Sequence, residues 1–163
     1  RQPWLDLAKG SQPDWDFLFS GYHACVDWPS AYYWRSLIKV YPEAKVLLTM
    51  RSAESWWNSF EATILKYIQS GDDPNGLAKL LVAEQVFDGR PDNRNHAIAT
   101  YNRNIEEVIA TVDPERLLIH SLGDGWEPLC NWLGLSVPEV SYPSGNTTQD
   151  IVGRFAEKGV DLS

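Results

Sequence analysis

The sequence is poor in cysteine and contains no long apolar run. Its two cysteines, Cys25 and Cys130, lie far apart and in no metal-ligand spacing, so we expect two buried free thiols in a reducing compartment. No stretch approaches the ~20 apolar residues of a membrane span, and no signal peptide is visible. These features predict a cytoplasmic protein without a membrane partner.

Positive charge is also in short supply. Lysine and arginine together number 14 against 22 aspartates and glutamates, which gives a formal net charge of −8 at pH 7. This excess argues against nucleic acid as a partner, and an anionic ligand would need a local basic spot. Eight tryptophans, by contrast, are many for 163 residues, and we expect most of them in the core or lining a pocket.

The order of the apolar segments predicts the fold class. Three short, non-alternating runs indicate buried parallel strands, at residues 23–27, 45–50 and 116–120. Helical patterns occupy residues 29–41, 52–71, 93–112 and 125–134, with a middle helix between loops at 70–76 and 88–93 and a last helix from about Gln149. Strands that alternate with helices predict a single α/β layered domain, with a parallel sheet covered on both faces.

The second strand ends directly before Arg51, and a helical segment that contains Ser59 follows. Ligands bind at the carboxyl ends of parallel strands, and a helix N-terminus, for which Ser52 is one candidate N-cap and Ser55 a rival one, favours an anion. An arginine can fork two hydrogen bonds onto a phosphate, and Ser59 lies about two helical turns farther on. The alternative is an arginine paired with Glu54 or Asp27 and a serine on the helix surface, and the spacing alone favours this alternative.

Asp27 ends the first predicted strand, in the segment CVDWP. At the carboxyl edge of the sheet it should share a crevice with Arg51. Trp28 and Val26 would partly desolvate the carboxylate and make it a better base. The alternative is an aspartate that caps the helix ahead of Pro29, and the two roles can coexist.

The histidines and the tryptophan pair carry weaker signals. His23, His96 and His120 show no metal-ligand spacing, so the sequence predicts no metal site, and we expect His23 and His120 in the core or at a strand edge. Trp56 and Trp57 are adjacent on a predicted helix, where one ring must face the sheet. We therefore expect packing rather than a binding platform from this pair.

Several motifs, in order along the chain, resemble the sulfotransferases that use 3′-phosphoadenosine 5′-phosphosulfate as donor. They are VDWP, YPEAKVLLTMRSAESWW, YNRNIEEV, DPERLLIHSLGDGWEPLCNWLG and YPSGNTTQ. The likeness runs from about Asp14 to Asp150 and is closer to the bacterial, fungal and invertebrate branch than to the cytosolic enzymes. The occurrence of YPEAKVLLT before DGWEPLC is the specific part of this signal.

The resemblance implies a three-layer P-loop NTPase-like domain, with a central parallel sheet flanked by helices, that transfers a sulfonate to a hydroxyl or amine of a small molecule. Arg51 and Ser59 match, in type and spacing, the pair that holds the donor's 3′-phosphate. Asp27 stands where cytosolic members place a catalytic histidine, and it would accept the acceptor's proton. Residues 119–124 resemble the stretch that lines the adenine site, and the acceptor pocket would be lined by aromatics near Asp27 and by the loops within residues 71–93. The resemblance implies no metal.

Two departures from the family pattern bear on activity. Cys25 stands where the cytosolic enzymes have a lysine that assists the leaving group. The strand and glycine-rich loop that open the family's fold are absent, and residues 1–18 resemble the helical region that follows that loop. Because the chain also begins at Arg1 rather than at methionine, we expect residues 1–163 to be one domain that is incomplete at its N-terminus.

An alternative function is a non-catalytic binding or scaffold module that keeps the fold without its donor loop. A P-loop kinase relative is disfavoured, because neither a Walker lysine loop nor an acidic metal-binding motif is visible. The sequence makes no prediction of an oligomeric state.

Overall fold

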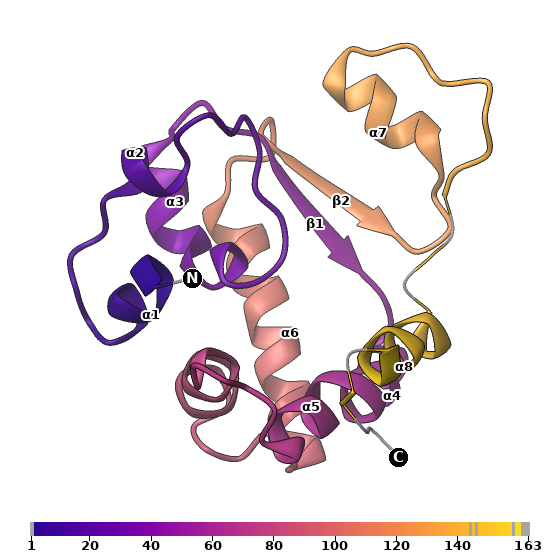
Figure 1. The fold of residues 1–163 in the computed structure, drawn as a ribbon. Coiled ribbons are helices and arrows are strands. Elements are labelled where there is room, and N and C mark those ends of the chain that lie inside the picture. The colour runs from indigo at the N-terminus through magenta and orange to yellow at the C-terminus, as the bar shows by residue number, and fades with distance from the viewer. Residues whose placement is uncertain (1, 144, 146, 158, 161–163) are drawn as a thin grey trace.

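The computed structural model describes residues 2–143, 145, 147–157, 159 and 160. The elements in chain order are α1 (Gln2–Ala8), α2 (Trp15–Leu18), the 3₁₀ turn η1 (Ser30–Tyr33), α3 (Trp34–Val40), β1 (Val46–Met50), α4 (Ala53–Phe60), the π-helical η2 (Glu61–Leu65), α5 (Lys66–Ser70), the π-helical η3 (Lys79–Val86), α6 (Arg94–Thr111), β2 (Leu117–Ser121), α7 (Trp126–Leu133) and α8 (Thr148–Glu157). Helices thus surround a small parallel sheet, which confirms the predicted α/β class, and every helical segment expected from the sequence is formed (Figure 1).

The sheet consists of β1 and β2, which pair in parallel. Their register runs from Val46 opposite Leu117 to Met50 opposite Ser121. The long helix α6 lies in the connection between them, as the crossover between two parallel strands requires. Figure 1 shows the two strands side by side, with β1 leading at its carboxyl end into α4.

The strand predicted at residues 23–27 is not formed. The side chains of His23, Cys25 and Val26 are exposed there, and Val26 keeps 90% of its surface open to solvent. A strand needs a neighbour that bonds its N–H and C=O groups, and among the described residues the sheet contains only β1 and β2. The predictions of a buried Cys25 and of a core or edge His23 are therefore wrong, whereas the predicted burial of Cys130 and His120 is confirmed.

The sheet is also less covered than the sequence predicts. Leu47 of β1 is 44% exposed and Ile119 of β2 is 42% exposed, although both belong to apolar runs. Adjacent positions on a strand point to opposite faces, and the register places Leu47 and Ile119 on different faces. Each face of this two-stranded sheet therefore leaves apolar surface open.

A continuous helical segment follows β1, and its ends are as predicted. The Ser52 hydroxyl accepts a hydrogen bond from the Ser55 backbone N–H at 3.2 Å, so Ser52 rather than Ser55 is the N-cap. The segment passes from α4 through η2 into α5 and stops at Gly71, whose φ of 78° suits glycine. Inside it, the Thr63 hydroxyl donates to the Ser59 carbonyl at 2.6 Å, which satisfies a carbonyl where the π-helical stretch begins.

The main core lies between the helices rather than against the sheet. Its buried members come from α4, η2, η3, α6 and the turn after η3: Trp57, Phe60, Leu65, Val82, Phe87 and Ala97. Trp56 is partly buried and packs against this cluster, which confirms that the Trp56–Trp57 pair serves packing. The turn between β1 and α4 is thus attached to the best-packed part of the molecule.

The helices α1, α2 and α3 gather on one side of the molecule (Figure 1). Of these, α3 is tied to α6 by the Trp34 indole N–H, which donates to Asn104 Oδ1 at 3.1 Å, and by an ion pair between Arg35 and Glu107. Burial, with a smaller contribution from Tyr32, raises the pKa of Tyr33 to about 12. The same side of the fold carries Trp4, whose ring faces the cavity described below.

Candidate functional site

The turn from β1 to α4 presents Arg51 with its guanidinium in solvent. Glu54, one proposed partner, forms an ion pair with Arg94 of α6 instead. Asp27, the other, makes no contact with Arg51, and within the described ranges no carboxylate lies at ion-pair distance from this guanidinium. The two structural pairings that the sequence left open are therefore not formed.

The backbone of Arg51 is held by a residue that the sequence did not single out. The Tyr101 hydroxyl donates to the Arg51 carbonyl at 3.0 Å and accepts from the Arg51 N–H at 3.3 Å. The Tyr101 ring stacks on Trp56, with centroids 4.6 Å apart and an interplanar angle of 14°. No local spacing reveals that the Tyr101 hydroxyl reaches a turn 50 residues away.

Ser59 lies on α4 and is half-buried. Seven residues are about two helical turns, so Ser59 lies on the same side of the helix as the N-cap Ser52, with Ser55 between them. No hydrogen bond joins Arg51 to Ser59 in the part of the chain that the structure describes. The structure therefore puts the two predicted residues on one strand–helix unit without direct contact between them.

Asp27 occupies an exposed loop rather than the end of a strand. Its φ is 63°, a left-handed conformation that non-glycine residues adopt rarely and that concentrates at functional sites. Its Oδ1 accepts from the Trp28 N–H at 2.7 Å, and its carbonyl accepts from the Ala31 N–H at 2.9 Å and the Ser30 hydroxyl at 2.8 Å.

Two expectations for Asp27 are wrong as a result. The carboxylate is not desolvated, because Asp27, Val26 and Trp28 are all exposed. Nor does it cap the following helix, because the group that bonds the first turn is the Asp27 carbonyl and not the side chain. The loop after Asp27 is anchored through the buried Ser30. The Asp27 carboxylate therefore faces solvent next to an anchored backbone segment.

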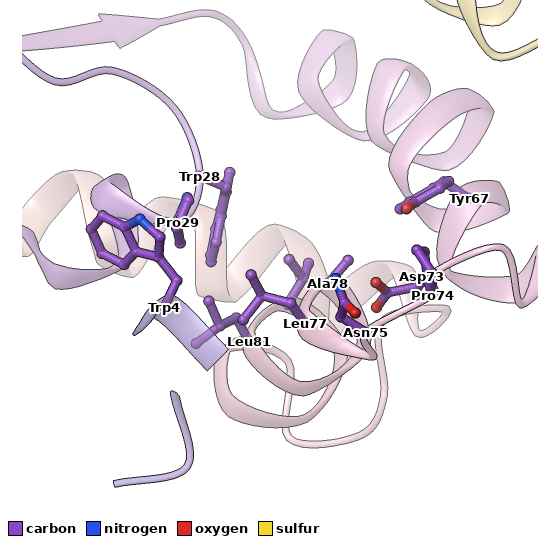
Figure 2. Close-up of a pocket in the computed structure, with 11 residues that line it drawn as sticks. Trp4, Trp28, Pro29, Tyr67, Asp73, Pro74, Asn75, Leu77, Ala78 and Leu81 are labelled. Atoms are coloured by element: carbon purple, nitrogen blue, oxygen red, sulfur yellow. The ribbon is translucent and has the colours of Figure 1, made fainter. Parts of the chain in front are cut away.

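A cavity of about 290 Å³ opens directly after Asp27. Its lining comes from α1, from the residues that follow Asp27, from α5, from the segment that leads into η3 and from η3 itself: Trp4, Trp28, Pro29, Tyr67, Asp73, Pro74, Asn75, Leu77, Ala78, Leu81 and Val82. Figure 2 shows Trp4 and Trp28 at one end and Tyr67 with Asp73 at the other. Trp28, next to Asp27, and residues 73–75 of the loop after α5 thus line the same cavity.

The residues after β2 form a tight turn beside the end of β1. Asp124 Oδ2 accepts from the Ser121 N–H at 2.6 Å, and the Leu122 N–H donates to the Met50 carbonyl at 3.3 Å. His120 is buried, and its Nδ1 has no hydrogen-bond partner in the described part of the chain and lies 3.9 Å from Asp124 Oδ2. The stretch 119–124 therefore adjoins the strand end that carries Arg51.

Known proteins resemble this chain in sequence. Residues 1–151 match the family described as "Sulfotransferase domain". The chain belongs to the sulfotransferase family. A relative from Aspergillus versicolor, "Ava biosynthesis cluster protein M", is 30% identical over 146 residues, which cover 80% of this chain and 56% of that protein. The chain thus spans a little over half the length of this curated relative.

In this member of the family the described residues offer chemistry of three kinds. Arg51, ahead of a helix N-terminus, is a cation suited to an oxyanion. Asp27 is an accessible carboxylate that can accept a proton. The cavity supplies an apolar wall with a few polar groups, as small-molecule sites do.

Among residues 2–143, 145, 147–157, 159 and 160, no group of three or more His, Cys, Asp or Glu side chains is placed to hold a metal ion. None of the helices in the described part of the chain has both the length and the apolar character needed to cross a bilayer.

Proposed function

We propose that this protein transfers a sulfonate group from 3′-phosphoadenosine 5′-phosphosulfate to a hydroxyl or amine of a small molecule. The observation that carries the proposal is the exposed guanidinium of Arg51 between the end of β1 and the start of α4, which has no ion-pair partner among the described residues. In a protein of net charge −8 a cation without a carboxylate partner is a local anion site. Its position at a strand's carboxyl end is where ligands of parallel sheets bind.

Arg51 and Ser59 hold the 3′-phosphate of the donor in this proposal. The guanidinium forks two hydrogen bonds onto phosphate oxygens, and the Ser59 hydroxyl adds a third from the side of α4. The free N–H groups at the start of α4 and its dipole favour the same negative charge. The residues present thus fit a phosphate, and their task is to fix the donor rather than to react.

The chemical step is an in-line substitution at sulfur. The acceptor oxygen or nitrogen forms a bond to sulfur while the bond from sulfur to the donor's phosphate oxygen breaks. Adenosine 3′,5′-bisphosphate leaves with the electron pair, and the acceptor's proton passes to the carboxylate of Asp27. As in phosphoryl transfer, positioning and charge stabilisation supply most of the rate.

The acceptor occupies the cavity that begins at Trp28. Trp4, Trp28 and Leu81 give it a flat, apolar wall, which suits a compact molecule with a ring. Asp73 and Asn75 at the other end suit a hydrogen-bonding group far from the reacting atom. The name of the Aspergillus relative places that protein in a biosynthesis cluster, which supports a small-molecule acceptor for this chain.

We also infer that β1 and β2 belong to a larger parallel sheet of the three-layer P-loop NTPase type in the full-length protein. The exposed Leu47 and Ile119 support this, because a sheet covered by helices on both faces would bury them. Hydrogen exchange tests this inference. The β1 and β2 amides should be more strongly protected in the full-length protein than in residues 1–163 alone.

The donor assignment is tested by calorimetry on the full-length protein with adenosine 3′,5′-bisphosphate. Arg51→Ala should weaken binding by about 10- to 100-fold, because a charge-assisted pair is worth roughly 1.5–3 kcal/mol. The affinity of Arg51→Lys should lie between those of the wild type and Arg51→Ala, because lysine keeps the positive charge but cannot form two parallel hydrogen bonds to the phosphate. Lys39→Ala removes one positive charge at an exposed position of α3 and is the control.

The outcomes separate the candidate functions. Wild-type affinity in Arg51→Ala means that Arg51 does not hold the donor. Donor binding without sulfonate transfer to any of a panel of phenols, alcohols and amines favours the non-catalytic binding module instead.

A further inference from the structure

Arg51 is the first residue beyond the β1–β2 ladder, so its backbone groups have no strand partner there. The Tyr101 hydroxyl supplies both missing hydrogen bonds, as acceptor from the Arg51 N–H at 3.3 Å and as donor to the Arg51 carbonyl at 3.0 Å. A phenolic hydroxyl can donate and accept at once. One side-chain atom of α6 therefore fixes both backbone polar groups of Arg51.

Tyr101 is itself rigidly held. Its ring stacks on Trp56, and Trp56 stacks on Phe60 with centroids 5.1 Å apart and an interplanar angle of 12°. Two turns earlier on the same side of α6, Arg94 forms its ion pair with Glu54 in the first turn of α4. The helix α6 thus contacts the start of α4 at two points. The Tyr101 hydroxyl makes the contact that is nearer to β1.

We propose that Tyr101 is a positioning residue that aims the guanidinium of Arg51 at the donor's 3′-phosphate. This inference rests on the proposed donor site. The guanidinium has no ion-pair partner within the described ranges to orient it, so its direction depends on the Arg51 backbone. Fixing that backbone in advance lowers the entropy lost when the phosphate binds.

The test is Tyr101→Phe in the full-length protein, a variant that keeps the stacked ring and removes only the hydroxyl. Calorimetry compares adenosine 3′,5′-bisphosphate with adenosine 5′-monophosphate, which lacks the 3′-phosphate. The bisphosphate affinity should fall about five- to tenfold, because the variant loses the two hydrogen bonds that fix the Arg51 backbone. The monophosphate affinity should stay at the wild-type value, which general damage to the fold would not allow.

Tyr41→Phe is the matched control, because Tyr41 is also half-buried and its hydroxyl makes no hydrogen bond within the described residues. Equal losses for both nucleotides in Tyr101→Phe, or none for either, overturn the positioning role. In another outcome, the wild-type protein binds the bisphosphate more tightly than the monophosphate, and this preference is lost in Arg51→Ala and kept in Tyr101→Phe. That result overturns only the role of Tyr101. Equal wild-type affinity for the two nucleotides overturns the donor site, and the role of Tyr101 with it.

Discussion

Residues 23–27 and residues 45–50 are two similar apolar runs that end next to a charged residue, Asp27 and Arg51 respectively. The second run forms β1, because β2 bonds its backbone in register. The first run forms an exposed loop, although the sequence predicts a strand there. The comparison teaches that an apolar run of five or six residues becomes a strand only where another strand is available to pair with it.

The same difference divides the proposed site into two parts. Arg51 is held by Tyr101 and stands on the packed α4–α6 unit. Asp27 is exposed and takes a left-handed backbone conformation, with only the segment after it anchored. We therefore assign binding to the rigid part and proton transfer to the exposed part, and each assignment can be tested separately.

The largest expected effect is that of Asp27→Asn on turnover. Loss of a general base costs about 10²- to 10⁴-fold in rate, whereas the affinity for adenosine 3′,5′-bisphosphate should not change, because Asp27 does not hold the donor. Steady-state kinetics of the full-length enzyme and calorimetry give the two readings. A variant with full turnover would show that Asp27 is not the base and that the exposed loop has no catalytic part.

An intermediate effect is expected on the free energy of unfolding, which should respond differently to substitutions in the two runs. Leu48→Ala in β1 should lower the free energy of unfolding by about 1–2 kcal/mol, less than at a fully buried leucine because Leu48 is half-buried. Val26→Ala should change it by less than about 0.5 kcal/mol, since 90% of Val26 is exposed. Chemical denaturation of the two variants measures both values. A large loss from Val26→Ala would mean that residues 23–27 are packed in solution after all.

The smallest effect concerns the ion pair that ties α3 to α6. The hydrogen bond from Arg35 lowers the pKa of Glu107, so the stabilisation is complete above the carboxyl's ordinary pKa and is lost as pH falls through the lowered value. Both side chains are more than a third exposed, at 47% and 40%, which keeps the contribution below about 1 kcal/mol. Glu107→Gln should destabilise the protein slightly at pH 7 and not at pH 2, as thermal unfolding can measure. An equal loss at both pH values would assign the effect to packing.

Elements whose signals are local were predicted well. Ser52 and Gly71 limit the helical segment after β1 because a cap and a left-handed stop act within one turn of the chain. The stripe that contains Trp56 and Trp57 predicted their packing for the same reason. The proposed site was foreseen in part: Arg51 and Ser59 share one strand–helix unit, whereas Asp27 was expected at a strand end that does not exist.

The sequence by itself determined the family through the order of its motifs, and it determined the helix boundaries and the place of Arg51 between a strand and a helix through residues close together in the chain. Only the tertiary structure decided that the Arg51 guanidinium forms no ion pair with the described residues, that Tyr101 holds its backbone and that residues 23–27 stay exposed. Each of those outcomes depends on which distant segment provides a hydrogen-bond or ion-pair partner. Local sequence patterns do not indicate which distant segment that is.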